Sequence, residues 1–168
     1  YQTWECHSNF SFDQPSANAE AMGSGTGVWL SPVGGYGTSG DSRRSYWSSR
    51  GGMVLSNDAY YEVFKTAATN FTNNYNCNFF KFDGISTIGN ATGPDSEEDA
   101  EGIISMERDI RTLKEDIFLN TTVGTWASPF WYRFTDATWR QDQDYSQFGD
   151  NSIDRENWIT YRDRLVYQ

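Results

Sequence analysis

The sequence predicts an α/β fold in which parallel strands alternate with helices, and three observations indicate it. Three short apolar runs have the length and composition of buried strands. The two segments between them repeat apolar residues at three- and four-residue spacing, as amphipathic helices do. Each helix is long enough to cross over, which places successive strands parallel to one another. A chain of 168 residues suffices for one sizeable core, so residues 1–168 are treated as a single domain.

The first elements of the chain are a helix and a strand. Residues 15–22 are Ala-rich and begin with a proline, which suits the first turn of a helix. Residues 26–30 predict the first strand. The Pro- and Gly-rich residues 31–37 follow as a loop whose backbone can approach a ligand closely. Residues 41–52 are polar and predict a further loop, either facing a substrate or solvated.

The middle of the chain repeats the pattern of helix and strand twice. The predicted order is a helix capped by Ser56 and ending at Asn73 or Asn74, a strand over 78–85, a helix capped by Asp95 or Ser96, and a strand with its exit over 117–126. Residues 130–150 are crowded with Trp, Asp and Arg, and a last helix is predicted to start near residue 157.

Asp83 stands at the end of the aromatic strand 78–85 and is followed by Gly84. A carboxylate at the end of a buried strand costs free energy unless it is paired or functional. In parallel α/β folds that end of the sheet is where catalytic groups gather. The alternative interpretation is an ordinary Asp-Gly turn.

Composition excludes several function classes. The net charge of −10 argues against nucleic-acid binding, which needs a basic surface. No apolar run approaches the ~18 residues of a membrane span. Cys6, Cys77 and His7 have no metal-ligand spacing, and the two cysteines could be free thiols or a disulfide. An acidic surface suits a secreted or periplasmic protein without fixing the compartment.

The residue types instead suit carbohydrate chemistry. Seven tryptophans exceed what a core of this size usually needs, and surplus Trp often lines grooves that hold sugar rings. Glycoside hydrolysis uses two carboxylates, for which Asp83 and one of Asp136, Asp142 or Asp144 are the candidates. Lys81 lies two residues before Asp83 and so on the same strand face, where it could keep Asp83 charged or bond a sugar hydroxyl. Carboxylates without His clusters argue against a transition-metal site. No metal and no cofactor is predicted.

The loops rich in Trp, Asp and Arg all follow strands, as the active face of a (β/α)8 TIM barrel does. A complete barrel needs ~250 residues. The chain is therefore predicted to be a partial barrel that covers the middle strands.

Several segments in the right order resemble the α-galactosidase (melibiase)-like glycoside hydrolases. They are residues 27–37 (GVWLSPVGGYG), 80–84 (FKFDG), 122–131 (TVGTWASPFW), 134–141 (FTDATWRQ) and 158–163 (WITYRD). The resemblance implies a TIM barrel and a retaining mechanism through a covalent glycosyl-enzyme intermediate.

The resemblance also implies roles for single residues. Asp83 matches the family's nucleophile in its Lys-x-Asp setting. Asp136 is assigned as the general acid/base, with Asp144 as the alternative, because the stretch after Trp131 has fewer acids than the family pattern. Trp29, Trp126 and Trp131 would form hydrophobic walls, and Lys81 and Arg140 would bond sugar hydroxyls.

Two other interpretations remain open on the sequence. A carbohydrate-binding or pseudo-enzyme segment would keep the aromatic groove but lack a working acid/base. A plain α/β domain would use its rings as core and Asp83 as a turn residue. A second carboxylate ~5–5.5 Å from Asp83 would distinguish a retaining enzyme from both.

Overall fold

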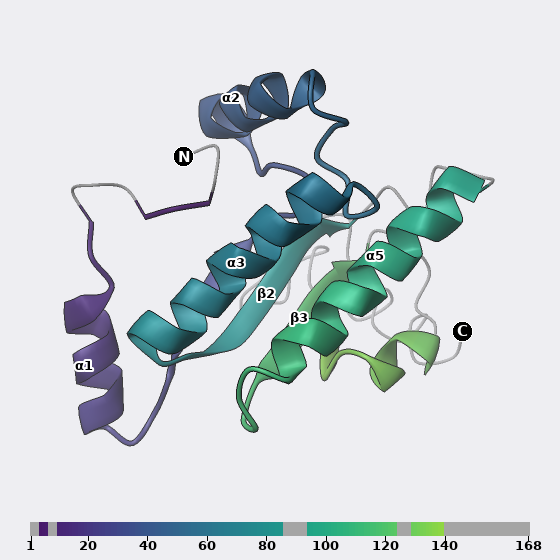
Figure 1. Cartoon of the computed structure of the whole chain (residues 1–168). Helices are drawn as coiled ribbons and strands as arrows, with labels where there is room; N and C mark the ends of the chain where they lie inside the picture. Colours follow the sequence, from purple (N-terminus) through teal and green to yellow (C-terminus); the bar gives the residue numbers. More distant parts are fainter. Residues whose placement is uncertain (1–3, 7–9, 86–93, 124–128, 140–168) are drawn as a thin grey trace, which may run out of the picture.

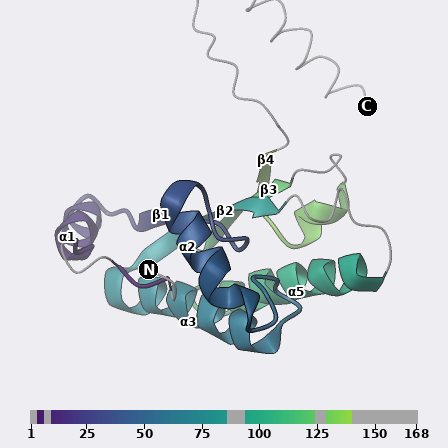
Figure 2. The same cartoon turned by 90° about the horizontal axis from the view of Figure 1, so that it is seen from above.

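The described part of the computed structural model comprises residues 4–6, 10–85, 94–123 and 129–139, and its centre is a parallel four-stranded sheet. The strands are β1 (Thr26–Leu30), β2 (Cys77–Ile85), β3 (Phe118–Val123) and β4 (Ala137–Trp139). They lie in the order β1-β2-β3-β4, and each pairs in parallel with the next (Figure 1 for β2 and β3, Figure 2 for all four). The predicted α/β class with a parallel sheet is confirmed.

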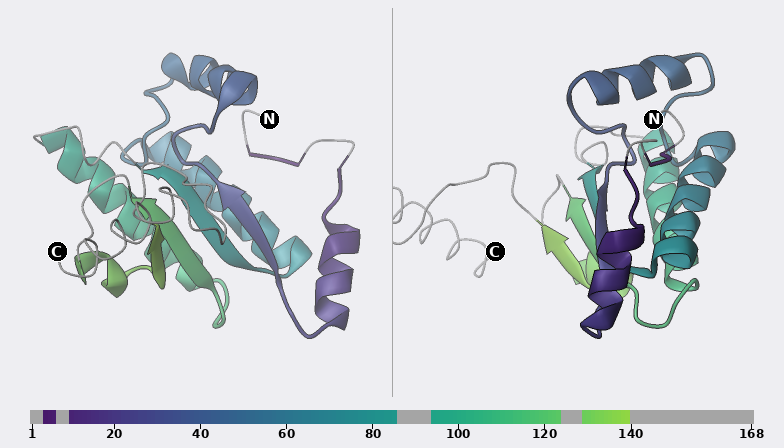
Figure 3. Two further views of the ribbon diagram at one scale, coloured as in Figure 1. Left: turned by 180° about the vertical axis from the view of Figure 1, so that it is seen from behind. Right: turned by 90° about the vertical axis from the view of Figure 1, so that its left-hand side faces the viewer.

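Two long helices connect the strands and cover one face of the sheet. Helix α3 (Asp58–Tyr75) precedes β2, and helix α5 (Pro94–Arg111) precedes β3. Figure 2 shows the two helices side by side along the same side of the strands. Viewed from behind, the strands lie in front of both helices (Figure 3, left).

Local signals explain where α3 begins and ends. The side chain of Asn57 caps the helix by accepting hydrogen bonds from the backbone N–H groups of Ala59 and Tyr60. The prediction that Ser56 is the cap was wrong by one residue. Asn76 adopts a left-handed conformation (φ 51°) and ends the helix after Tyr75, slightly later than predicted.

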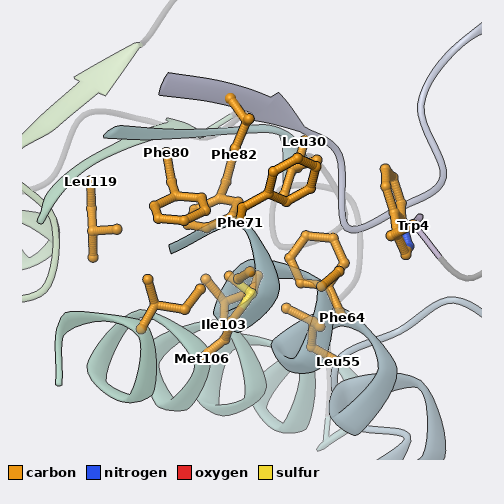
Figure 4. Close-up of a cluster of buried hydrophobic side chains, with 14 of the residues drawn as sticks. Trp4, Leu30, Leu55, Phe64, Phe71, Phe80, Phe82, Ile103, Met106 and Leu119 are labelled. Carbon is orange, nitrogen blue, oxygen red and sulfur yellow. The ribbon is translucent and has the colours of Figure 1, made fainter. Parts of the chain in front are cut away.

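The hydrophobic core fills the space between the sheet and the two helices. Alternate strand residues point toward the helices, and Figure 4 shows Phe80, Phe82 and Leu119 facing Phe64 and Met106. These five side chains are completely buried. Fully burying an apolar side chain of this kind contributes about 1.5–3 kcal/mol, so this layer accounts for much of the driving force for folding.

The opposite face of the sheet carries the other strand residues. Trp29, Phe79 and Phe118 lie on it and remain substantially exposed. Phe79 and Phe118 stack across β2 and β3 with ring centroids 5.6 Å apart. Strand pairing sets Lys81 beside Trp29 on one side and Asn120 on the other. Helices α3 and α5 lie on the other side of the sheet, so neither of them covers this face.

Three elements were not predicted as they occur. Residues 41–52, predicted as a loop, lie mostly in helix α2 (Gly37–Ser48), which sits beyond the carboxyl ends of β1 and β2 (Figure 1). The 3-10 helix η1 (Pro129–Arg133) and strand β4 were not assigned from the sequence. Helix α1 (Asp13–Ala21) agrees with its prediction to within two residues. The predicted helix near residue 157 lies outside the described residues.

The described residues bear on two expectations from the sequence, the state of the two cysteines and the lack of a membrane span. Cys6 is half-buried and Cys77 is buried, and both are free thiols, which decides between the two alternatives left open by the sequence. Within the described ranges, no helix combines the length and apolar character needed to cross a membrane.

Candidate functional site

Three consecutive strands bring polar side chains to the carboxyl edge of the sheet. Ser31 follows β1, Asp83 lies near the end of β2, and Thr122 lies near the end of β3. The hydroxyl oxygens of Ser31 and Thr122 are buried, and neither has a hydrogen-bond partner among the described residues. Buried polar atoms are normally satisfied, so unpaired ones on both sides of Asp83 are typical of a surface that awaits a polar ligand.

Asp83 is half-buried, and both of its carboxylate oxygens accept hydrogen bonds. The backbone N–H of Gly84 donates to Oδ1 at 2.9 Å. The hydroxyl of Tyr36, from the loop after β1, donates to Oδ2 at 3.2 Å. The sequence prediction that Asp83 lies at the carboxyl edge of a parallel sheet agrees with this placement.

Gly84 allows side chains of the loop after β1 to approach β2 closely next to Asp83. Its φ of +78° favours glycine, and an added Cβ would lie 2.8 Å from Val33 Cγ2 and 3.0 Å from Ser31 Oγ. A larger residue would therefore strain the backbone and force the side chains of Val33 and Ser31 to shift. The Asp-Gly pair lies within β2, where the pairing with β3 is irregular between Phe82 and Ile85, so the interpretation as an ordinary Asp-Gly turn was wrong.

Two exposed aromatic rings lie beside the carboxylate. Trp29 and Tyr36 stack with centroids 5.9 Å apart and planes inclined by 14°. Trp29 is 54% exposed and Tyr36 is 65% exposed, values far above those of core rings. Exposed rings of this kind offer flat apolar surface, which suits the apolar face of a sugar.

Lys81 shares the face of Trp29 and Asp83, as its position two residues before Asp83 predicted. It is half-buried, and strand pairing places it directly beside Trp29. Ring stacking, a hydrogen bond and strand pairing therefore link Trp29, Tyr36, Lys81 and Asp83 on the sheet face opposite α3 and α5.

Asp136 is not brought to this surface. It precedes β4, at the amino end of that strand, whereas Asp83 lies near the carboxyl end of β2. Its Oδ2 accepts hydrogen bonds from Arg111 at 3.0 Å and from the Leu119 backbone N–H at 2.8 Å. The assignment of Asp136 as general acid/base does not fit this geometry. A carboxylate that is paired at the opposite end of the strands cannot protonate the glycosidic bond at which Asp83 would attack.

Trp131 does not form an exposed wall. It lies in η1 with 6% of its surface exposed and belongs to the buried core. Its prediction as a substrate-binding residue is therefore corrected to a packing role. Trp126, Arg140, Asp142 and Asp144 lie outside the described residues, and their roles stay predictions.

Tyr36 is the site residue that sequence reasoning missed. The glycine-rich loop that carries it was expected to approach a ligand, but the tyrosine within that loop received no role. Its contact with Asp83 joins positions 47 apart in the chain, which no local pattern reveals.

Two hollows on the described surface illustrate what lies around the site: a small one is lined in part by Pro32 and Val33 of the loop after β1. A larger one, of about 480 Å³, lies between the segment 4–6 and the outer side of α3. The described ranges hold no cluster of three or more His, Cys, Asp or Glu residues placed to bind a metal ion. The candidate site is therefore defined by its exposed aromatic rings and by the polar residues at the carboxyl ends of the strands.

Comparison with known proteins supports the fold at a coarse level. No family model matches the chain, and no curated protein matches it. The structure is similar to that of a chitinase from Rhizomucor miehei, with a TM-score of 0.57 and 15% sequence identity. The match covers 95% of this chain and 54% of the chitinase chain, so this chain spans about half the length of that structure. At such low identity the likeness shows a shared fold alone.

Proposed function

We propose that the chain is part of a retaining glycoside hydrolase and that Asp83 is its nucleophile. The observation that carries the proposal is the position of Asp83, at the carboxyl edge of a parallel sheet and beside the exposed Trp29–Tyr36 pair. In barrel enzymes this edge holds the catalytic groups. The structure is similar to that of a chitinase, whose name is that of a glycoside-cleaving enzyme, and this likeness supports glycoside hydrolysis as the reaction class.

The proposed fold is a partial (β/α)8 barrel. Its support is the sheet with α3 and α5 on one face, an opposite face that neither of these two helices covers, and a match to 54% of a longer chain. In a complete barrel this opposite face would be the interior, which is filled by layers of side chains. Phe79 and Phe118 suit the lower layer, and Trp29 and Lys81 suit the next.

The proposed substrate is a terminal α-linked galactose or a related sugar, which rests on the resemblance to α-galactosidase-like enzymes. Asp83 would attack the anomeric carbon and form the covalent intermediate. Lys81 would bond a sugar hydroxyl, and Trp29 would pack against the ring. The mechanism needs neither a metal nor a cofactor.

Asp144 becomes the preferred candidate for the general acid/base. Asp136 is occupied by Arg111 and the Leu119 N–H, whereas Asp144 comes five residues after Trp139, where β4 ends. The carboxyl end of β4 is at the same edge of the sheet as Asp83. A retaining pair requires its carboxyl groups ~5–5.5 Å apart, which Asp144 would have to reach.

A non-catalytic carbohydrate-binding role is the second candidate. The exposed, stacked Trp29–Tyr36 pair favours it, because two such rings suffice to hold a sugar without any acid/base. This role predicts sugar binding that survives the loss of the Asp83 carboxylate.

The test is hydrolysis of an aryl α-galactoside by the chain and by two variants, Asp83→Ala and Asp144→Ala, with and without azide. Loss of the nucleophile is expected to abolish activity, and azide is expected to yield the glycosyl azide of inverted anomer. Loss of the acid/base should instead let azide yield the product of retained anomer. Asp58→Ala, an exposed aspartate at the start of α3, is the matched control and should behave as wild type.

The outcomes separate the two candidate functions. An active chain whose Asp83→Ala variant keeps full activity contradicts the nucleophile assignment. A folded chain that binds galactose but hydrolyses nothing supports the binding role instead.

A further inference from the structure

Tyr36 contacts two residues of the candidate site at once. Its ring stacks on Trp29, and its hydroxyl donates a hydrogen bond to Asp83 Oδ2. The other carboxylate oxygen accepts from the Gly84 backbone N–H. The carboxylate is thus held from two sides, once by its own strand and once by the loop after β1.

The loop that carries Tyr36 is anchored through its carbonyl groups. Arg43 donates to the Gly34 carbonyl and Arg44 to the Gly35 carbonyl, each at 2.9 Å. The two arginines lie on α2, the helix that the sequence did not predict. A charged donor forms a stronger hydrogen bond than a neutral one, so both anchors are effective.

A third anchor comes from the core. The buried hydroxyl of Tyr60 donates to the Pro32 carbonyl, and burial raises the pKa of Tyr60 well above its ordinary value. The hydroxyl therefore remains a protonated donor at all ordinary pH values. With three carbonyls of one short loop held, Tyr36 projects from a fixed support, which suits a positioning role better than a gate that must swing away.

We infer that Tyr36 is a positioning residue for Asp83, an inference that rests on the carbohydrate-cleaving function proposed above. Its hydroxyl fixes the rotation of the carboxylate, so that an oxygen of Asp83 faces a sugar lying against the exposed rings. Each carboxylate oxygen can accept more than one hydrogen bond, so the bond from Tyr36 leaves Asp83 able to attack the sugar. Tyr36 orients the carboxylate and takes no part in bond making or breaking.

The test compares Tyr36→Phe with wild type in aryl α-galactoside hydrolysis. This variant keeps the ring that stacks on Trp29 and removes only the hydroxyl. We expect kcat to fall about tenfold, as for the loss of one hydrogen bond to a charged group, while KM stays within about twofold. Tyr36→Ala removes the ring as well and should also raise KM, because the stacked surface is lost.

Tyr61→Phe is the matched control. Tyr61 on α3 also donates a hydrogen bond to an aspartate, Asp109, at 2.9 Å, but that pair joins α3 to α5 on the far side of the sheet. The control loses the same kind of bond and should keep the wild-type kcat and KM. A Tyr36→Phe enzyme with wild-type kcat would overturn the inference and leave the proposed function intact.

A measurement that needs no activity covers the case of an inactive chain. Carbodiimide-driven amine coupling, read by mass spectrometry, reports how freely each carboxylate reacts. We expect coupling at Asp83 to be several-fold faster in Tyr36→Phe than in wild type, with the Arg111-paired Asp136 as the internal reference. Faster coupling in an inactive chain means that Tyr36 holds a carboxylate that is not catalytic, so only the proposed function fails. Equal coupling rates overturn the positioning role.

Discussion

Glu107 is a carboxylate that folding buries between α5 and β3. The residue is 0% exposed. The Thr121 hydroxyl donates to its Oε1, and within the described ranges its Oε2 has no hydrogen-bond partner. Burial raises the pKa of Glu107 from 4.5 to about 7, against the smaller opposite effects of Thr121 and Arg111, while nearby Asp136 adds to the rise. Glu107 is therefore protonated in the folded protein over a range where the unfolded chain is ionised.

This difference makes stability depend on pH. Since the pKa of Glu107 is higher in the folded state, its protonated form favours folding fully below pH 4.5, and that advantage is lost as the pH rises through 7. Glu107→Gln keeps the shape and cannot ionise. We predict that it raises the free energy of unfolding, relative to wild type, by about 2 to 3 kcal/mol more at pH 8 than at pH 5. Urea unfolding at both pH values measures it.

Other titrating groups cancel in this comparison, because wild type and variant share them. Glu101→Gln, at an exposed position of the same helix, is the control and should change the free energy of unfolding equally at both pH values. If the Glu107→Gln difference is also the same at pH 5 and pH 8, then Glu107 ionises normally in the folded state.

At the scale of elements, α5 approaches the segment before α3 so closely that Gly102 has no room for a side chain. A Cβ added there would lie 2.7 Å from the backbone carbon and oxygen of Leu55. Backbone cannot rotate aside as a flexible side chain does. The position of α5 over the core thus depends on the absence of a methyl group at residue 102.

Gly102→Ala tests this packing. Alanine has the better helix propensity by about 1 kcal/mol, so an open site would be stabilised. We predict instead a loss of about 1–3 kcal/mol in the free energy of unfolding, because the helix must shift away from Leu55. Chemical denaturation measures it, and Glu101→Ala should lie within about 0.5 kcal/mol of wild type. A stabilised Gly102→Ala protein would mean that α5 is free to move outward.

At the scale of the whole molecule, Arg111 and Asp136 tie helix α5 to the β3–β4 side of the sheet. Arg111, at the end of α5, donates to the carbonyls of Ile117 and Phe134 as well as to the Asp136 carboxylate. Asp136 in turn accepts from the Leu119 N–H in β3. The edge strand β4 is therefore held at its start by a charged pair as well as by its ladder.

We expect substitutions at Asp136 and Asp83 to have opposite effects on stability and on activity. We predict that Asp136→Ala lowers the free energy of unfolding by about 1–3 kcal/mol while folded molecules keep most of the wild-type kcat on an aryl α-galactoside. Asp83→Ala should show the reverse, with little change in stability and no hydrolysis. Paired denaturation and kinetic measurements decide it. Full stability with lost activity in Asp136→Ala would restore Asp136 as the acid/base.

The sequence by itself determined the parts of the fold that local pattern controls. The apolar face of α3 repeats at helical spacing, and the aromatic run of β2 reads as a buried strand, because both depend on neighbours a few residues away. The same pattern placed Asp83 and Lys81 on one strand face at the carboxyl edge. Helix α2 escaped prediction because its glycines and serines give no apolar period, and β4 because three residues are too short to show one.

Only the tertiary structure decided which of the candidate residues meet. Tyr36 and Asp83 are 47 positions apart, and Arg111 and Asp136 are 25 apart. Such pairs form because strand order and register bring their segments together, and these are set by packing of the whole sheet against α3 and α5. Packing therefore made Asp136 a partner of Arg111, buried Trp131, and set Tyr36 against the carboxylate that the sequence had singled out.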